Sequence, residues 1–256
     1  MHLDSMLSVP DGEPIYYIGP SISAGIKPAV IYFALSAETS LFQDPFNQPA
    51  IELAQQDIRV FSWDLPFHTK GADPHTAMSH WAEEFAHNPH FISHFISLCQ
   101  KRLDFLLNEN LIDRNCLAVA GLSRGGFMAT HLAAHYPTIK WVLGFAPLTA
   151  PEFLQEFPHS IEADYSAIHL TQLADQLTQT HVRFYIGNHD TRVKTEACFT
   201  FIKTLTEKSF AKGVRSPQVE LIIYPSIGHK GHGTSPEIFK NGASWLKDQL
   251  INRAPL

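Results

Sequence analysis

The sequence predicts an α/β fold, a doubly wound and mostly parallel sheet with helices on both faces. Short runs rich in β-branched and aromatic residues alternate along the chain with longer segments of helical pattern, which is typical of this class. The chain has 256 residues, of which 45% are hydrophobic and 17% charged, so it can bury a substantial core. At this length we expect a single domain over residues 1–256.

The expected elements follow in chain order. Six segments have the pattern of buried strands: 29–33, 58–63, 117–120, 141–145, 182–186 and 219–224. Five segments predict helices: 51–56, 90–108, 125–135, 194–207 and 236–251, the last with Pro236 at its start, where the missing N–H is harmless. Residues 66–115 and 149–181 contain no predicted strand, and we expect at most a small helical cap within 149–181.

Charge and hydropathy exclude several classes of partner. The formal net charge is −6 and no run of Lys and Arg occurs, which argues against nucleic acid. No stretch reaches the roughly 18 to 20 apolar residues that span a bilayer, and the first residues lack the order of a signal peptide. We therefore expect a cytoplasmic protein with no membrane span whose ligands are small molecules; its oligomeric state is left open.

Neither the cysteines nor the histidines indicate a metal site. Cys99, Cys116 and Cys198 are too far apart for a CxxC pattern. The 15 histidines include a crowded group, but no HExxH or carboxylate-backed pattern accompanies it, so we interpret the group as the surface of a solvated helix. Its members are His75, His80, His87, His90 and His94. We expect no metal and no cofactor.

The most specific motif is a GxSxG sequence, Gly121-Leu122-Ser123-Arg124-Gly125, placed between a predicted strand and a predicted helix. This is the context of a nucleophile elbow, in which a strained turn exposes the serine hydroxyl. The amides that start the helix face a developing oxyanion, and the Arg124 N–H is the first donor that we expect. The alternatives are a plain turn or a phosphate loop, but GxxxxGK[ST] is not matched.

A serine nucleophile needs a base and an acid, which follow such an elbow in the order Ser, Asp or Glu, His. Asp190 follows the strand at 182–186, although it could instead only cap the next helix. His229 and His232 follow the last strand. We predict His229 as the base because it is the first imidazole to arrive at that edge of the sheet. His232, in a Gly-His-Gly context, stays open as the alternative.

With these motifs the chain resembles the α/β-hydrolase superfamily, in its esterase and prolyl-oligopeptidase-like branch, which includes dienelactone hydrolases. The resemblance runs from the strand near Val30 through 64–66, 121–126, 187–193 and 228–229 to the terminal helix. It implies Ser123 as nucleophile, Asp190 as acid and His229 as base, and the family's frequent Tyr-Pro-x-x-Gly-His order aligns on His229. Dienelactone hydrolases have cysteine at the elbow, and serine disfavours that activity here.

One departure concerns the second oxyanion donor. Members of the family commonly have His-Gly after the strand that supplies it, whereas this chain reads Phe33-Ala34-Leu35-Ser36. By alignment the N–H of Ser36, or else that of Leu35, is the expected donor. We expect a serine hydrolase that acts on carboxylic esters of small molecules. The alternatives are a small peptidase or amidase, an acyltransferase with the same triad, or a catalytically silent binding protein.

Overall fold

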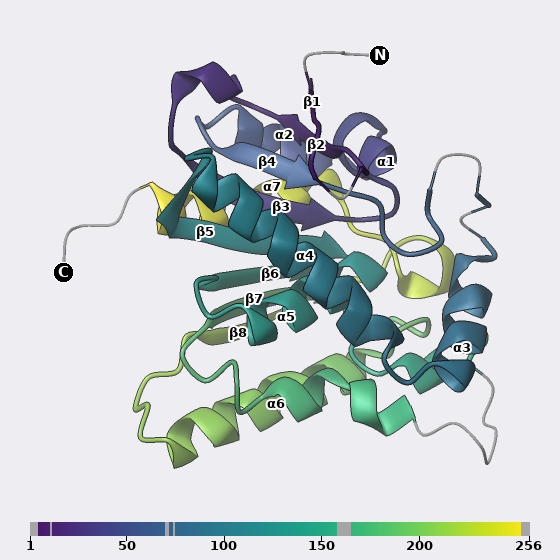
Figure 1. The fold of residues 1–256 in the computed structure, drawn as a ribbon. Helices are drawn as coiled ribbons and strands as arrows, with labels where there is room; N and C mark the ends of the chain where they lie inside the picture. The colour runs from purple at the N-terminus through teal and green to yellow at the C-terminus, as the bar shows by residue number, and fades with distance from the viewer. Residues whose placement is uncertain (1–4, 11, 70–71, 74, 158–164, 252–256) are drawn as a thin grey trace.

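The computed structural model describes residues 5–10, 12–69, 72–73, 75–157 and 165–251. Their eight strands form one sheet (Figure 1). In spatial order these are β1 (Met6–Leu7), β2 (Ile15–Ile18), β4 (Arg59–Ser62), β3 (Lys27–Phe33), β5 (Ile112–Leu122), β6 (Trp141–Phe145), β7 (His181–Gly187) and β8 (Val219–Tyr224). All pairs from β4 to β8 are parallel, and β1 and β2 add an antiparallel edge.

Helices cover both faces of the sheet (Figure 1). One face carries α3 (Ala77–His87), α4 (Phe91–Asn108), α5 (Arg124–His135) and α6 (Thr195–Ala211), and the other carries α1 (Ala37–Phe42), α2 (Gln48–Ala54) and α7 (Pro236–Leu250). Alternate residues of a strand point to opposite faces, so β3 sends Ile31 and Phe33 into one core and Val30 and Tyr32 into the other. This is the α/β-hydrolase architecture that the sequence predicted.

Every predicted strand and helix is present, with small shifts at the ends. The structure adds β1, β2, α1 and α3, which are short or lie in segments without clear periodicity. Strand β5 begins at Ile112 instead of 117, because its first half is polar and partly exposed and therefore lacks the pattern of a buried strand.

Between β6 and β7 the described residues form three short 3-10 helices, η3 (Pro151–Phe153), η4 (Tyr165–Ile168) and η5 (Leu170–Leu173). Residues 158–164 of the expected cap lie outside the described residues. Within the part of the chain that the structure describes, no helix combines the length and the apolar character needed to cross a membrane.

Candidate active site

The carboxyl ends of the parallel strands meet at one edge of the sheet, where ligands bind in open α/β folds. Strand β3 ends at Phe33, β5 at Leu122, β7 at Gly187 and β8 at Tyr224. The loops after β5, β7 and β8 carry Ser123, Asp190 and two histidines. Residues far apart in the chain therefore meet at this edge.

Ser123 lies in the sharp turn that joins β5 to α5. Its backbone has φ 54° and ψ −117°, a conformation that a residue with a side chain adopts only under strain. The turn is held on both sides, because Ser123 N donates to Phe145 O at 2.8 Å and Ser123 O accepts from Phe127 N and Leu148 N at 3.2 and 3.1 Å. The predicted elbow geometry is thus present.

Two glycines make this turn sterically possible. A Cβ on Gly121 would lie 2.2 Å from the carbonyl carbon of Gly125, and a Cβ on Gly125 would lie 1.9 Å from the carbonyl oxygen of Phe33. Both distances are far shorter than any van der Waals contact. The glycines of the motif therefore allow strand and helix to approach each other.

A continuous chain of hydrogen bonds joins the serine to a histidine and a carboxylate. The Ser123 Oγ lies 2.9 Å from Nε2 of His232, and Nδ1 of the same ring lies 2.7 Å from Asp190 Oδ2. The carboxylate can only accept, so Nδ1 carries the proton and Nε2 can accept from the hydroxyl. This is the arrangement of a nucleophile, a base and an orienting acid.

The choice of His229 as the base was wrong in this geometry, because His232 occupies the position between Ser123 and Asp190. After β8 the chain does not return directly: it forms the 3-10 turn η6 (His229–Gly231), with positive φ at Gly228, Lys230 and Gly231. Gly233 N then donates to Ile227 O at 2.8 Å and closes the loop. His229 lies on this closed loop and is exposed.

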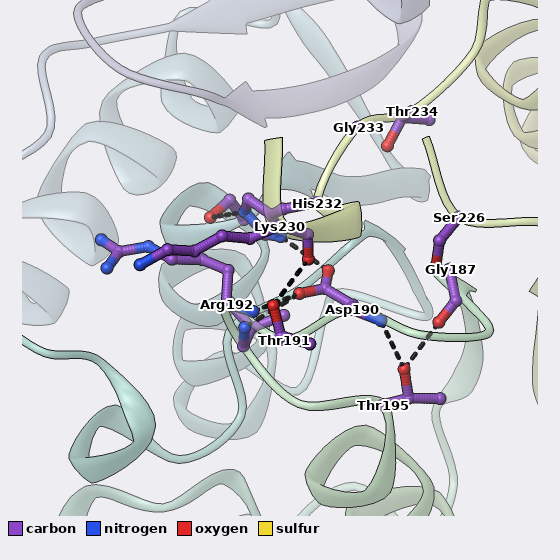
Figure 2. Close-up of polar contacts among 12 residues, drawn as sticks. Gly187, Asp190, Thr191, Arg192, Thr195, Ser226, Lys230, His232, Gly233 and Thr234 are labelled. Atoms are coloured by element: carbon purple, nitrogen blue, oxygen red, sulfur yellow. Dashed lines mark hydrogen bonds and ion pairs between the residues drawn. The ribbon is translucent and has the colours of Figure 1, made fainter. Parts of the chain in front are cut away.

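Several contacts hold the acid and the base loops together (Figure 2). Thr191 donates to Lys230 O through both its backbone N and its hydroxyl, at 2.9 and 3.0 Å. Gly231 packs so closely that a Cβ there would lie 2.2 Å from His189 O. The positions of Asp190 and His232 are therefore fixed relative to each other.

Asp190 is almost fully buried and its carboxylate is well supplied with donors. Oδ1 accepts from the backbone N–H groups of Arg192 and Val193 at 2.9 and 3.0 Å, while Oδ2 meets His232. Thr195 Oγ1 accepts from Asp190 N and donates to Gly187 O (Figure 2). The carboxylate thus caps the turn before α6 with one oxygen and orients the imidazole with the other.

The expected oxyanion donors have different surroundings. Arg124 begins α5, so its N–H belongs to the helix N-terminus beside Ser123. Ser36 is the N-cap of α1, and its hydroxyl accepts from Thr39 N. The N–H of Leu35, the alternative donor, is 3.2 Å from Ser40 Oγ, which also accepts from Ala34 N at 2.9 Å. The identity of the second donor stays a prediction.

A cavity of about 450 Å³ opens at Ser123. Its lining combines apolar side chains with a few polar and basic ones: Ala34, Leu35, Thr39, Gln43, Phe46, His75, Leu122, Ser123, Arg124 and His232. A volume of this size fits a small organic molecule.

The crowded histidines lie only partly on helix surfaces: His80 and His87 are on α3 and His94 is on α4, whereas His90 caps α4 and His75 precedes α3 and lines the cavity at Ser123. All five are exposed, and His80 contacts Glu83 at 3.4 Å. Among the described residues, no group of three or more His, Cys, Asp and Glu side chains is placed to hold a metal ion.

Comparisons with solved structures identify the fold. The chain superposes on a protein named as a dipeptidyl aminopeptidase IV from Bacteroides ovatus with a TM-score of 0.72 and 19% identity, covering 96% of this chain and 35% of that one. TT1662 from Thermus thermophilus superposes with a TM-score of 0.72 at 16% identity, covering 97% of this chain and 98% of that one. A cold-adapted esterase from an Arctic intertidal metagenomic library superposes with a TM-score of 0.62 at 21% identity, covering 96% of this chain and 92% of that one.

This chain spans only about a third of the length of the Bacteroides protein. No curated protein sequence matches it significantly. A family model, however, matches residues 97–253, well over half of the chain, including the elbow, Asp190 and both candidate histidines. The expected resemblance is thereby confirmed: within the α/β-hydrolases, this chain belongs to the prolyl oligopeptidase family.

Proposed function

We propose that the protein is a serine hydrolase that forms an acyl-enzyme on Ser123 and acts on carboxylic esters of small molecules. One observation carries this proposal: the hydrogen-bonded chain Ser123–His232–Asp190 at a strained strand-to-helix turn. A plain turn needs neither the strain nor the aligned imidazole.

In the first half of the proposed reaction, Ser123 Oγ attacks the carbonyl carbon of the ester. Its proton moves to Nε2 of His232 at the same time, and the imidazolium that forms is stabilised by the Asp190 carboxylate. The tetrahedral oxyanion accepts from the Arg124 N–H and from a second amide near Ser36. When it collapses, His232 gives its proton to the leaving alcohol and the acyl group remains on Ser123.

In the second half, water takes the place of the alcohol. His232 accepts a proton from the water as it attacks the acyl carbonyl, and then returns that proton to Ser123 Oγ when the acid leaves. The enzyme is regenerated without any net transfer of electrons. No cofactor takes part in this scheme.

The cavity favours small esters over extended peptides, because about 450 Å³ holds a compact molecule. We also propose that the chain is one domain with a small cap within 149–181. Glu156 in this segment forms a bidentate ion pair with Arg192, and Gln155 accepts from Lys230 Nζ at 3.0 Å. These contacts tie the segment to the loops of Asp190 and His232.

Aminoacyl amides are the second candidate class of substrate, and membership of the prolyl oligopeptidase family favours them. The decisive experiment measures kcat/KM for 4-nitrophenyl esters of increasing acyl length and for aminoacyl 4-nitroanilides, next to labelling by a fluorophosphonate. Ester turnover with labelling at Ser123 would support the proposal. Preferential turnover of the anilides would favour the peptidase, and absence of both labelling and turnover would favour a silent binding protein.

A further inference from the structure

Thr195, the first residue of α6, joins the proposed acid to the end of a strand. Its hydroxyl accepts from the backbone N–H of Asp190 at 3.1 Å and donates to the carbonyl oxygen of Gly187, the last residue of β7, at 2.6 Å (Figure 2). Thr195 is buried, so leaving these two backbone groups without a partner would be costly. One hydroxyl therefore connects the acid, the strand and the helix.

The side-chain contacts of Asp190 within its own loop are of a different kind. Oδ1 accepts from the backbone N–H groups of Arg192 and Val193, which belong to the same loop and move with it. Lys194, at the end of this loop, has φ 67° and ψ 113°, a conformation that a residue with a side chain keeps only where its surroundings hold it. The hydroxyl of Thr195 follows directly and connects this strained loop to β7, an inner strand of the sheet.

We propose that Thr195 is a positioning residue: by holding the backbone of Asp190 against β7, its hydroxyl sets the direction in which the carboxylate meets His232. This inference rests on the proposed serine hydrolase and names a further residue on which its rate depends. Asp190 Oδ2 lies 2.7 Å from Nδ1 of His232, whose Nε2 lies 2.9 Å from Ser123 Oγ. A displacement of the acid is therefore passed through the imidazole to the nucleophile.

The position of Thr195 predicts an effect on the rate and not on substrate binding. The cavity at Ser123 is lined by other residues, so a substrate in it meets the same surface with or without this hydroxyl. A misplacement of about 1 Å in the geometry of a reaction can lower its rate by roughly a hundredfold. We therefore expect kcat to depend on Thr195 and KM to be independent of it.

Two substitutions separate the hydroxyl from the shape of the side chain. Thr195→Val keeps the branched shape and removes both hydrogen bonds, whereas Thr195→Ser keeps the hydroxyl. For a short 4-nitrophenyl ester we expect Thr195→Val to lower kcat by about tenfold to a hundredfold and to leave KM within about twofold of wild type. The rate of fluorophosphonate labelling should fall in parallel. Thr195→Ser should retain most of the wild-type kcat.

Thr206→Val is the matched control. Thr206 lies about three turns further along α6, and its hydroxyl donates to the carbonyl oxygen of Ile202 at 2.8 Å. The control removes a helix hydroxyl and one hydrogen bond at a distance from the proposed triad. Its kcat should equal that of wild type.

A double-mutant cycle tests whether the effect passes through the acid. Asp190→Asn has already lost the carboxylate that Thr195 is proposed to orient, so adding Thr195→Val should lower kcat by no more than about threefold further. If the two losses multiply instead, Thr195 acts independently of Asp190 and the inference is wrong.

The inference is also overturned if kcat of Thr195→Val stays within about twofold of wild type, or if Thr195→Ser loses as much activity as Thr195→Val. Thermal unfolding checks the fold of each variant. If Thr195→Val does not fold, Thr195→Ala takes its place in the same comparisons, because it removes the hydroxyl without placing a new methyl group beside the two backbone groups.

These comparisons require an active wild type, so a negative result in them leaves the proposed hydrolase intact. A different result marks failure of the proposed function: wild type then hydrolyses neither esters nor aminoacyl anilides, and the fluorophosphonate does not label Ser123. In that case the role of Thr195 is refuted together with the function on which it rests.

Discussion

Replacing each histidine of the last loop by glutamine gives a matched comparison for the proposed base. His232→Gln removes the ring whose two nitrogens lie 2.9 Å from Ser123 Oγ and 2.7 Å from Asp190 Oδ2. Loss of one triad member lowers kcat by roughly 10⁴- to 10⁶-fold, which corresponds to about 5 to 8 kcal/mol of transition-state free energy. His229→Gln changes an exposed side chain, so its stability should stay within about 0.5 kcal/mol of wild type.

The assay is hydrolysis of a short 4-nitrophenyl ester, with fluorophosphonate labelling as a second readout of Ser123 reactivity. Buried Asp190 keeps two backbone donors in His232→Gln, so the variant should still fold, which thermal unfolding would check. A large loss of activity in His229→Gln together with near-normal activity in His232→Gln would show that His229, not His232, is the base. Equal, small effects in both would mean that neither imidazole acts as the base.

Four further results are expected. Ser123→Ala should abolish labelling and lower ester turnover by several orders of magnitude with the fold intact. Asp190→Asn should slow turnover by about 10⁴-fold, because the amide favours the wrong tautomer of the base. Gly231→Ala should reduce turnover, because the new Cβ would lie 2.2 Å from the carbonyl oxygen of His189. Gly213→Ala is the control: Gly213 also has positive φ but open space around it, so this variant should lose only about 1 kcal/mol of stability in chemical denaturation. Burial, and then the charge of Arg124, lowers the pKa of His68 from 6.5 to about 4, so protonation of His68 favours the unfolded chain. The free energy of unfolding should therefore fall by up to about 3 kcal/mol as the pH drops from 6.5 to 4. In His68→Gln this fall should be shallower.

The parts of the site that sequence reasoning predicted are those that local contacts determine. The elbow needs Gly121 because a Cβ there would meet the backbone of Gly125, four residues further on, and that requirement is visible in the motif itself. The Asp190 carboxylate likewise binds amides two and three residues further on. Short-range sterics and hydrogen bonds leave a pattern in the sequence.

The segment after β3, where the second oxyanion donor is predicted, could not be described from the sequence alone. The amides of Ala34 and Leu35 both donate to Ser40 Oγ, a hydroxyl supplied from within α1. Ser40 in turn donates to Ser36 O at 2.7 Å. A buried serine in a short helix carries no signal of such a role, so alignment alone could not say how the segment after β3 directs its amides.

The choice between the two histidines depended on contacts between loops that are distant in sequence. His229 would reach the sheet edge first only if the chain took the shortest path after β8. The chain takes a longer path, because Lys230 O accepts from Thr191 in the loop of Asp190 and Gly231 packs against His189 O. Those contacts require left-handed backbone at Lys230 and Gly231 and turn the chain once more before His232. The glycines at 231 and 233 were the available signal. A residue without a Cβ beside a histidine indicates where the backbone must pass close to another loop, and Asp190, the proposed acid, lies on that other loop.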